Sequence, residues 1–202
     1  KSMGYYFVKV KPSITTEDTL NTARIIIDID KGPRAKIKKI SFIGDKKIKD
    51  KKLLDVIASE EHRFWKFISR NVYLDQSRLN LDKRLIENYY KNLGYYNVNV
   101  LNTYAELDKK GNFNLTYNIS AGNLYYFNEF TLNLPENYNI EDFEKITKRF
   151  PKLNGEKFSI DDFNQILFDI ENVATSRLYD FINAEVVEEV VDTDKLNFSF
   201  NV

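Results

Sequence analysis

The sequence predicts an α+β fold of tandem β-α-α-β-β modules, each a three-stranded mixed sheet with two helices on one face. The first observation is a repeat: "GYYFVKV" at residues 4–10 returns as "GYYNVNV" at residues 94–100, 90 residues later. The second is that "IDIDKG" ends at Gly32 and "YNISAG" ends at Gly122, at the same spacing. The third is the order of apolar patterns within a copy, which alternate, then follow helical spacing, then alternate twice more. A period of this length makes each copy a small domain rather than a solenoid repeat.

This period divides the 202 residues into three parts. Residues 1–31 are expected to be the C-terminal hairpin of a truncated unit, while residues 32–121 and 122–202 are expected to be complete units. A third, altered copy of the tyrosine motif, "YDFINAEVV", begins at Tyr179. We interpret the chain as a fragment of a longer protein, because its first residues correspond to the middle of a unit.

The central copy provides one pattern for each element. An alternating stretch with a slip predicts a strand over residues 35–43, followed by a turn at Gly44-Asp45. Asp50 is expected to cap a short helix, and residues 75–93 carry the apolar spacing of a long one. A hairpin follows, with arms at residues 96–107 and 113–119 around "DKKGN". The last copy repeats this order with strand 125–134, helix 143–150 after Asn139, a helix with its last apolar position at Leu178, and strands 181–191 and 196–202. Ser159 and Asp162 are expected to form a capping box at the start of that second helix.

The repeated glycine has a structural explanation. Gly94 follows the last apolar residue of the long helix, where many helices end in a left-handed residue that glycine adopts without strain. Asp180 stands at the corresponding point of the last copy, and Asp is one of the few other residues tolerated at positive φ. Gly122 is expected to be a short joint at the end of the central copy. We therefore interpret the motif as a helix stop and a strand start, not as a catalytic group.

Composition excludes several functional classes. Thirty acidic and thirty basic residues give zero net charge, without the basic footprint of a nucleic-acid binder. Cysteine is absent and His62 is the single histidine, which excludes thiolate sites, histidine metal sets and a Ser-His-Asp triad. The sequence also lacks a phosphate-binding glycine loop. We predict no enzymatic activity, no cofactor, no metal site and no nucleic-acid partner.

The second strand of each unit is expected to lie at a sheet edge, because the first and third strands can pair in parallel. An edge strand offers backbone N–H and C=O groups to which an extended peptide can add. Two interpretations apply to the outward side chains: a bulge or a neighbouring domain covers them after Val100, or they face a partner. The predicted partner-binding residues of the central copy are Tyr96, Val98, Val100, Leu101, Thr103, Ala105 and Leu107.

A second surface of interest is "RFWKF", with Phe64, Trp65 and Phe67. These aromatic side chains could enter a membrane interface. They could also cap the core beneath a long connection or contact another domain. Because the segment is short and lacks a sustained amphipathic helix, the second interpretation is favoured.

The chain resembles the POTRA (polypeptide-transport-associated) domain family. The likeness rests on "ISFIGD", "NYYKNLGYYNVNV" and "ISAG", which recur in the family's order, and on the insertion "EEHRFWKFISRNVYLDQSRLNLDKRL". That insertion is similar to the third of the five such domains in the outer-membrane β-barrel assembly factor, so the last unit would be the fourth. Asp180, in place of the expected glycine, departs from the pattern.

The resemblance implies a periplasmic location and a C-terminal membrane barrel in the same parent chain. It implies a scaffold that receives unfolded outer-membrane proteins and docks accessory lipoproteins. One alternative keeps the fold in a related barrel that secretes or translocates a specific polypeptide. Another is a division or membrane-anchored adaptor, although the tandem array speaks against a role that needs one unit.

Overall fold

A computed structural model of the chain describes residues 5–17, 22–32, 34–64, 69–179 and 183–202. By its contacts the chain divides into two compact units. The first comprises Lys1–Ile86 and Val100–Ile119, and the second comprises Glu87–Asn99 and Ser120–Val202.

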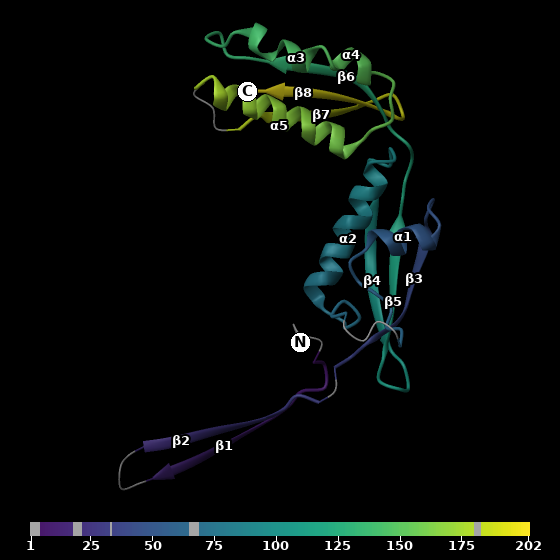
Figure 1. Cartoon of the computed structure of the whole chain (residues 1–202), viewed down its shortest axis with the longest axis vertical. Helices are drawn as coiled ribbons and strands as arrows, with labels where there is room; N and C mark the ends of the chain where they lie inside the picture. The colour runs from purple at the N-terminus through teal and green to yellow at the C-terminus, as the bar shows by residue number, and fades with distance from the viewer. Residues whose placement is uncertain (1–4, 18–21, 33, 65–68, 180–182) are drawn as a thin grey trace. The chain divides into compact units, whose positions relative to one another are not determined.

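The first three-stranded sheet has the order β3-β5-β4, with the third strand of the module in the centre. Its strands are β3 (Ile37–Asp45), β4 (Asn99–Leu107) and β5 (Phe113–Ser120), and its helices are α1 (Asp50–Val56) and α2 (Gln76–Lys91) (Figure 1). Strand β3 continues through the pair Gly44-Asp45, so the turn predicted there is wrong. The predicted cap is also wrong, because Asp50 is the first helical residue and Lys49 occupies the cap position without a side-chain bond.

The second three-stranded sheet has the order β6-β8-β7. Its strands are β6 (Tyr126–Asn133), β7 (Glu185–Val191) and β8 (Lys195–Asn201). Strand β6 pairs with β8 in parallel, with a register shift between Phe127 and Glu129, and β7 pairs with β8 antiparallel. The predicted parallel pairing of first and third strands is therefore present in this module.

The first helical segment of the second module is broken into short pieces. Where one helix was predicted over 143–150, the structure has a 3-10 turn, η1 (Ile140–Phe143), then α3 (Glu144–Thr147) and α4 (Phe150–Leu153). Pro151 explains the last break, because proline lacks an N–H and is tolerated only in the first turn of a helix. The cap at Asn139 is confirmed, since its side chain accepts a hydrogen bond from the N–H of Glu141 at 3.1 Å.

The core of the second module is rich in aromatic residues. Helix α5 (Ile160–Ser176) begins at Ser159, whose hydroxyl accepts a bond from the N–H of Asp162 at 3.2 Å. Its Phe163 ring lies 5.0 Å from the ring of Phe198 on β8. Buried residues alternate along β8, so the helix covers one face of the sheet. The predicted α+β fold class is confirmed.

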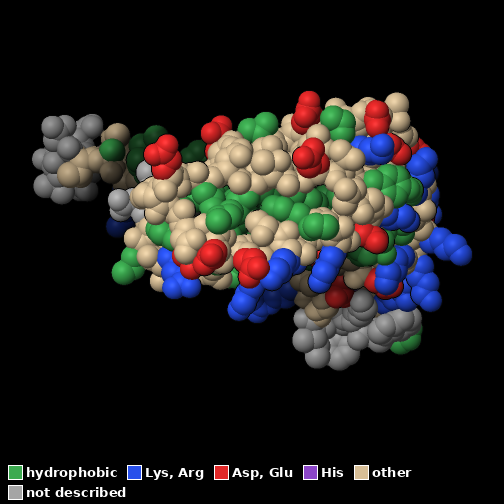
Figure 2. Space-filling view, turned by 90° about the horizontal axis from the view of Figure 1, so that it is seen from above, with side chains coloured by type: hydrophobic (Ala, Val, Ile, Leu, Met, Phe, Trp, Pro, Cys, Tyr) green, Lys and Arg blue, Asp and Glu red, His purple; other side chains and the backbone are tan. Residues whose placement is uncertain are grey.

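The N-terminal part of the chain forms a two-stranded antiparallel hairpin, β1 (Lys9–Glu17) and β2 (Thr22–Asp30) (Figure 1). All residues of β2 are exposed. Within the described residues, no helix is long and apolar enough to cross a membrane. On the face seen in Figure 2, acidic and basic side chains both surround a strip of hydrophobic ones, so the balanced charge is also mixed in space.

Candidate functional site

The outer edge of β3 is covered by the connection between α1 and α2. The N–H of Ile37 donates to the carbonyl of Val72 at 2.8 Å, and the carbonyl of Ile37 accepts from the N–H of His62 at 2.7 Å. The N–H of Leu74 donates to the carbonyl of Ala35 at 3.1 Å. The start of β3 therefore has backbone partners on its outer side.

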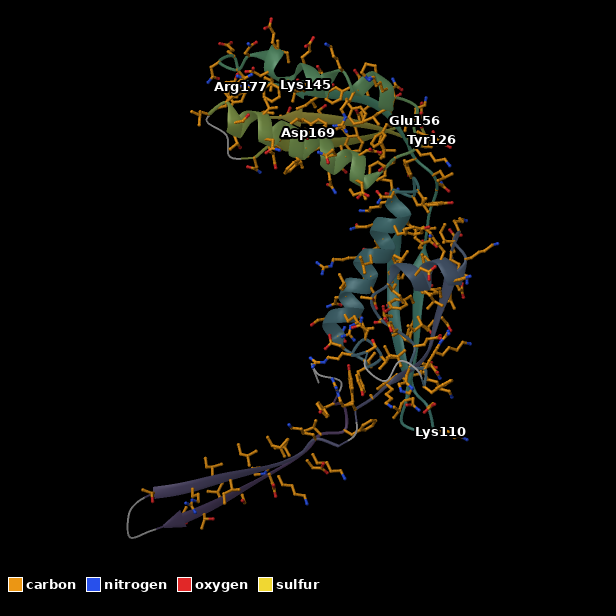
Figure 3. The ribbon with its side chains drawn as sticks, viewed as in Figure 1. Lys110, Tyr126, Lys145, Glu156, Asp169 and Arg177 are labelled. Carbon is orange, nitrogen blue, oxygen red and sulfur yellow. The ribbon has the colours of Figure 1, made fainter. Side chains whose placement is uncertain are left out.

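The outer edge of β6 is covered in the same way, by the residues between α4 and α5. The N–H of Phe127 donates to Glu156 at 2.9 Å, and its carbonyl accepts from Gly155 at 2.8 Å. The N–H of Phe158 donates to the carbonyl of Tyr125 at 2.9 Å. Figure 3 labels Tyr126 and Glu156 at this end of the module.

The opposite edges of the two sheets are formed by β4 and β7, and they are not paired in this way. Strand β4 pairs with β5, and β7 pairs with β8, but no strand of the described part of the chain lies on their other sides. The β4–β5 turn is closed by Asp108, whose carboxylate accepts from the N–H groups of Lys110 and Asn112 at 2.8 and 2.9 Å. These bonds, together with Lys38, hold the pKa of Asp108 below its usual value. Lys110 lies at the far tip of the turn (Figure 3).

Apart from Tyr96, the predicted partner-binding residues form a buried group and a more exposed group, and all of them except Val98 lie on β4. Val98 and Val100 are buried, so they can contribute only backbone groups to a partner. Leu101 and Leu107 are 50% and 51% exposed, and Ala105 is exposed while Thr103 is half-buried. After Val100 these side chains are therefore not covered by the described part of the chain.

Sequence analysis missed one exposed side chain of this strand. Tyr104 is 46% exposed on the opposite phase from Leu101, so beyond Val100 both faces of β4 are largely open. The tyrosine itself could have signalled this, because tyrosine is common at interfaces.

Strand β7 presents different side chains at its free edge. Three of its seven residues, Glu185, Glu188 and Glu189, are exposed acids. Val187 and Val190 of the same strand are 50% and 51% exposed. Charged side chains on an edge strand oppose pairing with another strand. The free edge of β4 has a single acid, Glu106, and no base.

Tyr96 lies before β4, which begins at Asn99, and its ring belongs to the aromatic core of the second unit. Its centroid lies 5.1 Å from that of Phe158 and 5.5 Å from that of Tyr125. Its hydroxyl donates to the carboxylate of Glu188, and burial followed by this bond raises the pKa of Tyr96 to about 12. Tyr96 therefore has a structural role, and partner binding through its side chain is not supported.

Gly94 adopts the left-handed conformation predicted for it, with φ of 100°. Its carbonyl accepts from the N–H of Tyr125 at 2.8 Å, and a Cβ at this position would lie 3.0 Å from the side chain of Leu124. Gly122 also has positive φ, at 70°. Glycine is therefore required at position 94 by both backbone conformation and space.

The helix stop of the last copy was assigned to the wrong residue. Asp180 lies outside the described residues, and the left-handed residue after α5 is Leu178, with φ of 59°. The N–H of Leu178 donates to Thr175 and that of Tyr179 donates to Ala174, both at 3.1 Å. This is the bond pattern found at Gly94, displaced by 84 residues rather than 86.

The aromatic segment is only partly described. Phe64 is 84% exposed, so core capping does not apply to this side chain. Trp65 and Phe67 lie outside the described residues. His62 has its Nε2 atom 3.2 Å from the ammonium of Lys36. In the part of the chain that the structure describes, no group of three or more His, Cys, Asp or Glu side chains could hold a metal ion.

Comparison with known proteins identifies the first module. Residues 35–122 match the family model of POTRA, described as the surface antigen variable number repeat. Residues 35–122 are therefore similar to a POTRA domain. The outer membrane protein assembly factor BamA of Buchnera aphidicola subsp. Acyrthosiphon pisum is 27% identical over 187 residues, which cover 90% of this chain and 29% of that protein. BamA of Neisseria meningitidis serogroup B is 28% identical over 100 residues, 50% of this chain and 12% of its own length.

Solved structures with the same POTRA fold extend over both modules. The crystal structure of Haemophilus influenzae BamA POTRA3-5 covers all of this chain and 74% of its own, with a TM-score of 0.63 and 14% identity. BamA from Haemophilus ducreyi lacking POTRA domains 1-3 covers 82% of this chain and 29% of its own, with a TM-score of 0.58 and 13% identity. The predicted resemblance to the POTRA domains of BamA is confirmed. The chain spans less than a third of the length of these curated relatives.

Proposed function

We propose that this chain is a scaffold and receptor segment of an outer-membrane protein assembly machinery. It captures unfolded β-barrel precursors and docks accessory lipoproteins by β-augmentation. The observation that carries the proposal is the edge of β4 that faces away from β5, where no described strand pairs. The setting comes from the relatives, which are named outer membrane protein assembly factors.

The edge of β4 suits an added strand better than the edge of β7. Leu101, Tyr104 and Leu107 offer apolar and aromatic surface on both faces of β4. Pairing a client along β7 would instead bring it beside three glutamates, which repel acidic segments and remain hydrated. Predicted binding through Thr103 and Ala105 uses mainly their backbone groups, because both side chains are small.

Main-chain pairing gives the affinity that a receptor for many clients needs. Each added backbone hydrogen bond contributes roughly 0.5–1.5 kcal/mol net. A strand of nine residues has four or five residues whose N–H and C=O groups both point to the free edge, so an added strand has room for at least four or five bonds. Capture is then weak, reversible and tolerant of sequence, with side chains of β4 adding modest preference.

The proposal also includes where the chain lies in the cell and which longer protein it belongs to. The chain lies in the periplasm as part of an outer-membrane protein, and its parent carries a C-terminal membrane barrel. Its units are residues 1–31, 32–121 and 122–202, with the first the end of a preceding module. The exposed aromatic Phe64 and the neighbouring Trp65 and Phe67 are a second contact surface within this setting.

The hairpin supports the assignment of residues 1–31 by its side-chain pattern. Paired residues such as Val10 with Ile29 and Ile14 with Ile25 share a face, while Lys and Asp residues occupy the other. An apolar face on a two-stranded hairpin requires further strands or helices for independent stability. The large apolar side chains of this face are all more than half exposed: Val10, Ile14, Ile25, Ile27 and Ile29.

The test uses proline at two adjacent positions of β4, Asn102→Pro and Thr103→Pro. Neighbouring N–H groups point to opposite sides of a strand, so one proline removes an outward donor and the other removes a bond to β5. Each variant is checked for fold by circular dichroism, and binding of an unfolded barrel-precursor peptide is measured by fluorescence anisotropy. We expect the folded variant of the pair to bind the peptide about tenfold or more weakly. The peptide loses main-chain hydrogen bonds to β4 and clashes with the pyrrolidine ring of the introduced proline.

The matched control places the same pair of prolines in β7, as Val187→Pro and Glu188→Pro. The folded member of that pair is expected to bind the peptide as the parent chain does. Unchanged binding by the folded β4 variant, or an equal loss in β7, would count against β4 as the site.

A further inference from the structure

One edge of strand β2 is not covered by any strand of the described part of the chain. Strand β2 pairs with β1 on its other side and is the second arm of its hairpin, as β5 and β8 are in the two modules. Strands β5 and β8 each lie between two other strands, whereas β2 has one neighbour. Because all nine residues of β2 are exposed, the N–H and C=O groups along this edge can pair with a further strand.

The two edges of the hairpin carry different side chains. Strand β1 contains Lys9, Lys11 and Pro12, and both lysine and proline on an edge strand oppose pairing with another strand. Strand β2 has neither proline nor lysine, and it is rich in β-branched residues, which are favoured in paired strands. The hairpin is therefore protected along β1 and open along β2. Four isoleucines of β2 are between 51% and 63% exposed: Ile25, Ile26, Ile27 and Ile29.

The sequence of β2, TARIIIDID, is complementary to itself in antiparallel pairing. With Ile26 on a two-fold axis, each residue lies opposite the residue that is equally far beyond Ile26 in the second copy. Arg24 then faces Asp28 of the second copy, and the symmetry makes this contact twice. Opposite charges directly across two strands stabilise the pair. Among the residues that the structure describes, neither Arg24 nor Asp28 forms an ion pair, so the second copy would supply each with one.

The same register also continues the apolar face of the hairpin. Side chains directly opposite each other lie on the same face of a sheet. Ile25 is set against Ile27 of the second copy, and Ala23 is set against Ile29. The result is a sheet of order β1-β2-β2-β1, with more strands than the isolated hairpin, which is marginal by itself. Its two outer strands are both β1, so its new edges are the protected ones.

We propose that this chain forms a two-fold symmetric dimer through antiparallel pairing of β2 with β2 of a second copy. The interface is isologous, as in most dimers of identical chains. Nine residues in each strand give about eight to ten backbone hydrogen bonds across the axis. The charge pairs fix the register, because a slip by one residue separates Arg24 from Asp28 and moves the isoleucines to the other face. The dimer does not use β4 and is independent of client capture there.

The first test measures the oligomeric state of the 202-residue chain by sedimentation velocity over a range of concentrations. We expect a reversible equilibrium between monomer and dimer. Arg24→Glu and Asp28→Arg each place like charges opposite each other at both contacts, and each should weaken dimerisation about tenfold or more. The control Glu189→Arg makes the same kind of change as Asp28→Arg on the free edge of β7, and it should dimerise as the parent chain does.

A second measurement uses the two charge variants together. An equimolar mixture of Arg24→Glu and Asp28→Arg should form heterodimers, because opposite charges then meet at both contacts. The double variant Arg24→Glu, Asp28→Arg should form homodimers again for the same reason. Within the hairpin Asp28 lies across from Lys11, so Asp28→Arg could also weaken the hairpin itself. Heterodimers in the mixture would show that both variants keep a hairpin able to pair.

Several outcomes would overturn the proposal. One is a chain that remains monomeric at every concentration. Another is a dimer that neither charge variant weakens, because it would then form through the apolar face of the hairpin or through another edge. A loss of dimer in Glu189→Arg equal to that in Asp28→Arg would have the same meaning. Failure of both the mixture and the double variant to recover the dimer would exclude the contact between Arg24 and Asp28.

Discussion

The two modules share a fold but place different chemistry at matching core positions. Aligning α2 and α5 at their left-handed caps, Gly94 and Leu178, sets Asp82 against Ile166, and both are fully buried. Tyr117 is the third buried residue of β5, and Phe200 is the third of β8. A polar pair in one module therefore corresponds to an apolar pair in the other.

The buried carboxylate of Asp82 has three hydrogen-bond donors. Its Oδ1 accepts from the N–H groups of Ala58 and Ser59 at 2.7 and 3.0 Å, and its Oδ2 accepts from the hydroxyl of Tyr117 at 2.6 Å. Burial, reinforced by the charge of Asp82, raises the pKa of Tyr117 and keeps the phenol protonated. A buried charge that accepts three bonds is compatible with a stable core, because its desolvation is offset.

The lengths of the helix connections explain why one module needs this carboxylate. Helix α1 ends at Val56 and α2 begins at Gln76, whereas α4 ends at Leu153 and α5 begins at Ile160. The longer connection brings the N–H groups of its first residues into the core, where they require acceptors. The shorter one does not, and phenylalanine and isoleucine fill the space instead.

The largest expected effect follows from removing the carboxylate. Asp82→Ala leaves two amides and the hydroxyl of Tyr117 buried without their acceptor, and should destabilise the first module by about 3 kcal/mol. Hydrogen exchange measured by mass spectrometry should show faster exchange in α2 and β5, with β8 unchanged. Asp55→Ala, at an exposed position of α1, is the control and should change stability by less than about 0.5 kcal/mol. Equal protection in Asp82→Ala and the parent chain would refute the role of the network.

The second prediction introduces the apolar pair of the second module at the matching positions of the first. The double variant Asp82→Ile, Tyr117→Phe removes the hydroxyl together with its acceptor, so it should regain part of the stability lost in Asp82→Ala. It should remain about 1–2 kcal/mol below the parent chain, because the amides of Ala58 and Ser59 still lack an acceptor. Urea unfolding of the single variants Asp82→Ile and Tyr117→Phe and of the double variant measures the coupling energy between the two positions. Full recovery would mean that the amides find other partners and that connection length does not explain Asp82.

Particular residues show which features could be predicted from the sequence. The helix stop at Gly94 and the cap at Ser159 follow from local rules, so a short stretch of sequence determines them. The edge position of β4 follows from strand order. By contrast, Asp82 looks like an ordinary polar residue on a helix, since its donors come from the distant Ala58, Ser59 and Tyr117.

Substitutions at the two left-handed helix caps should have smaller effects on stability, with opposite signs. Gly94→Ala introduces a Cβ at positive φ and beside Leu124, and should destabilise the second unit by about 1–2 kcal/mol. Leu178→Gly removes a side chain that is 90% exposed from a left-handed position, and should stabilise the same unit by up to about 1 kcal/mol. Thermal unfolding of both variants beside the parent chain measures the two shifts. A destabilised Leu178→Gly would show that α5 does not end in the left-handed conformation.

The smallest effect concerns pH and tests the link between Tyr96 and Glu188. The pKa of Tyr96 is raised from 10.0 to about 12 in the folded chain, so folding favours the protonated phenol. This contribution is fully present below pH 10 and is lost as the pH rises through about 12. Tyr96→Phe lacks the titrating group, so the difference in unfolding free energy between it and the parent chain should narrow over this pH window. Glu188→Gln should shift that window downward, because the carboxylate contributes to the raised pKa. A difference between Tyr96→Phe and the parent that stays constant from pH 9 to about 12 would show that the hydroxyl is not bonded in the folded state.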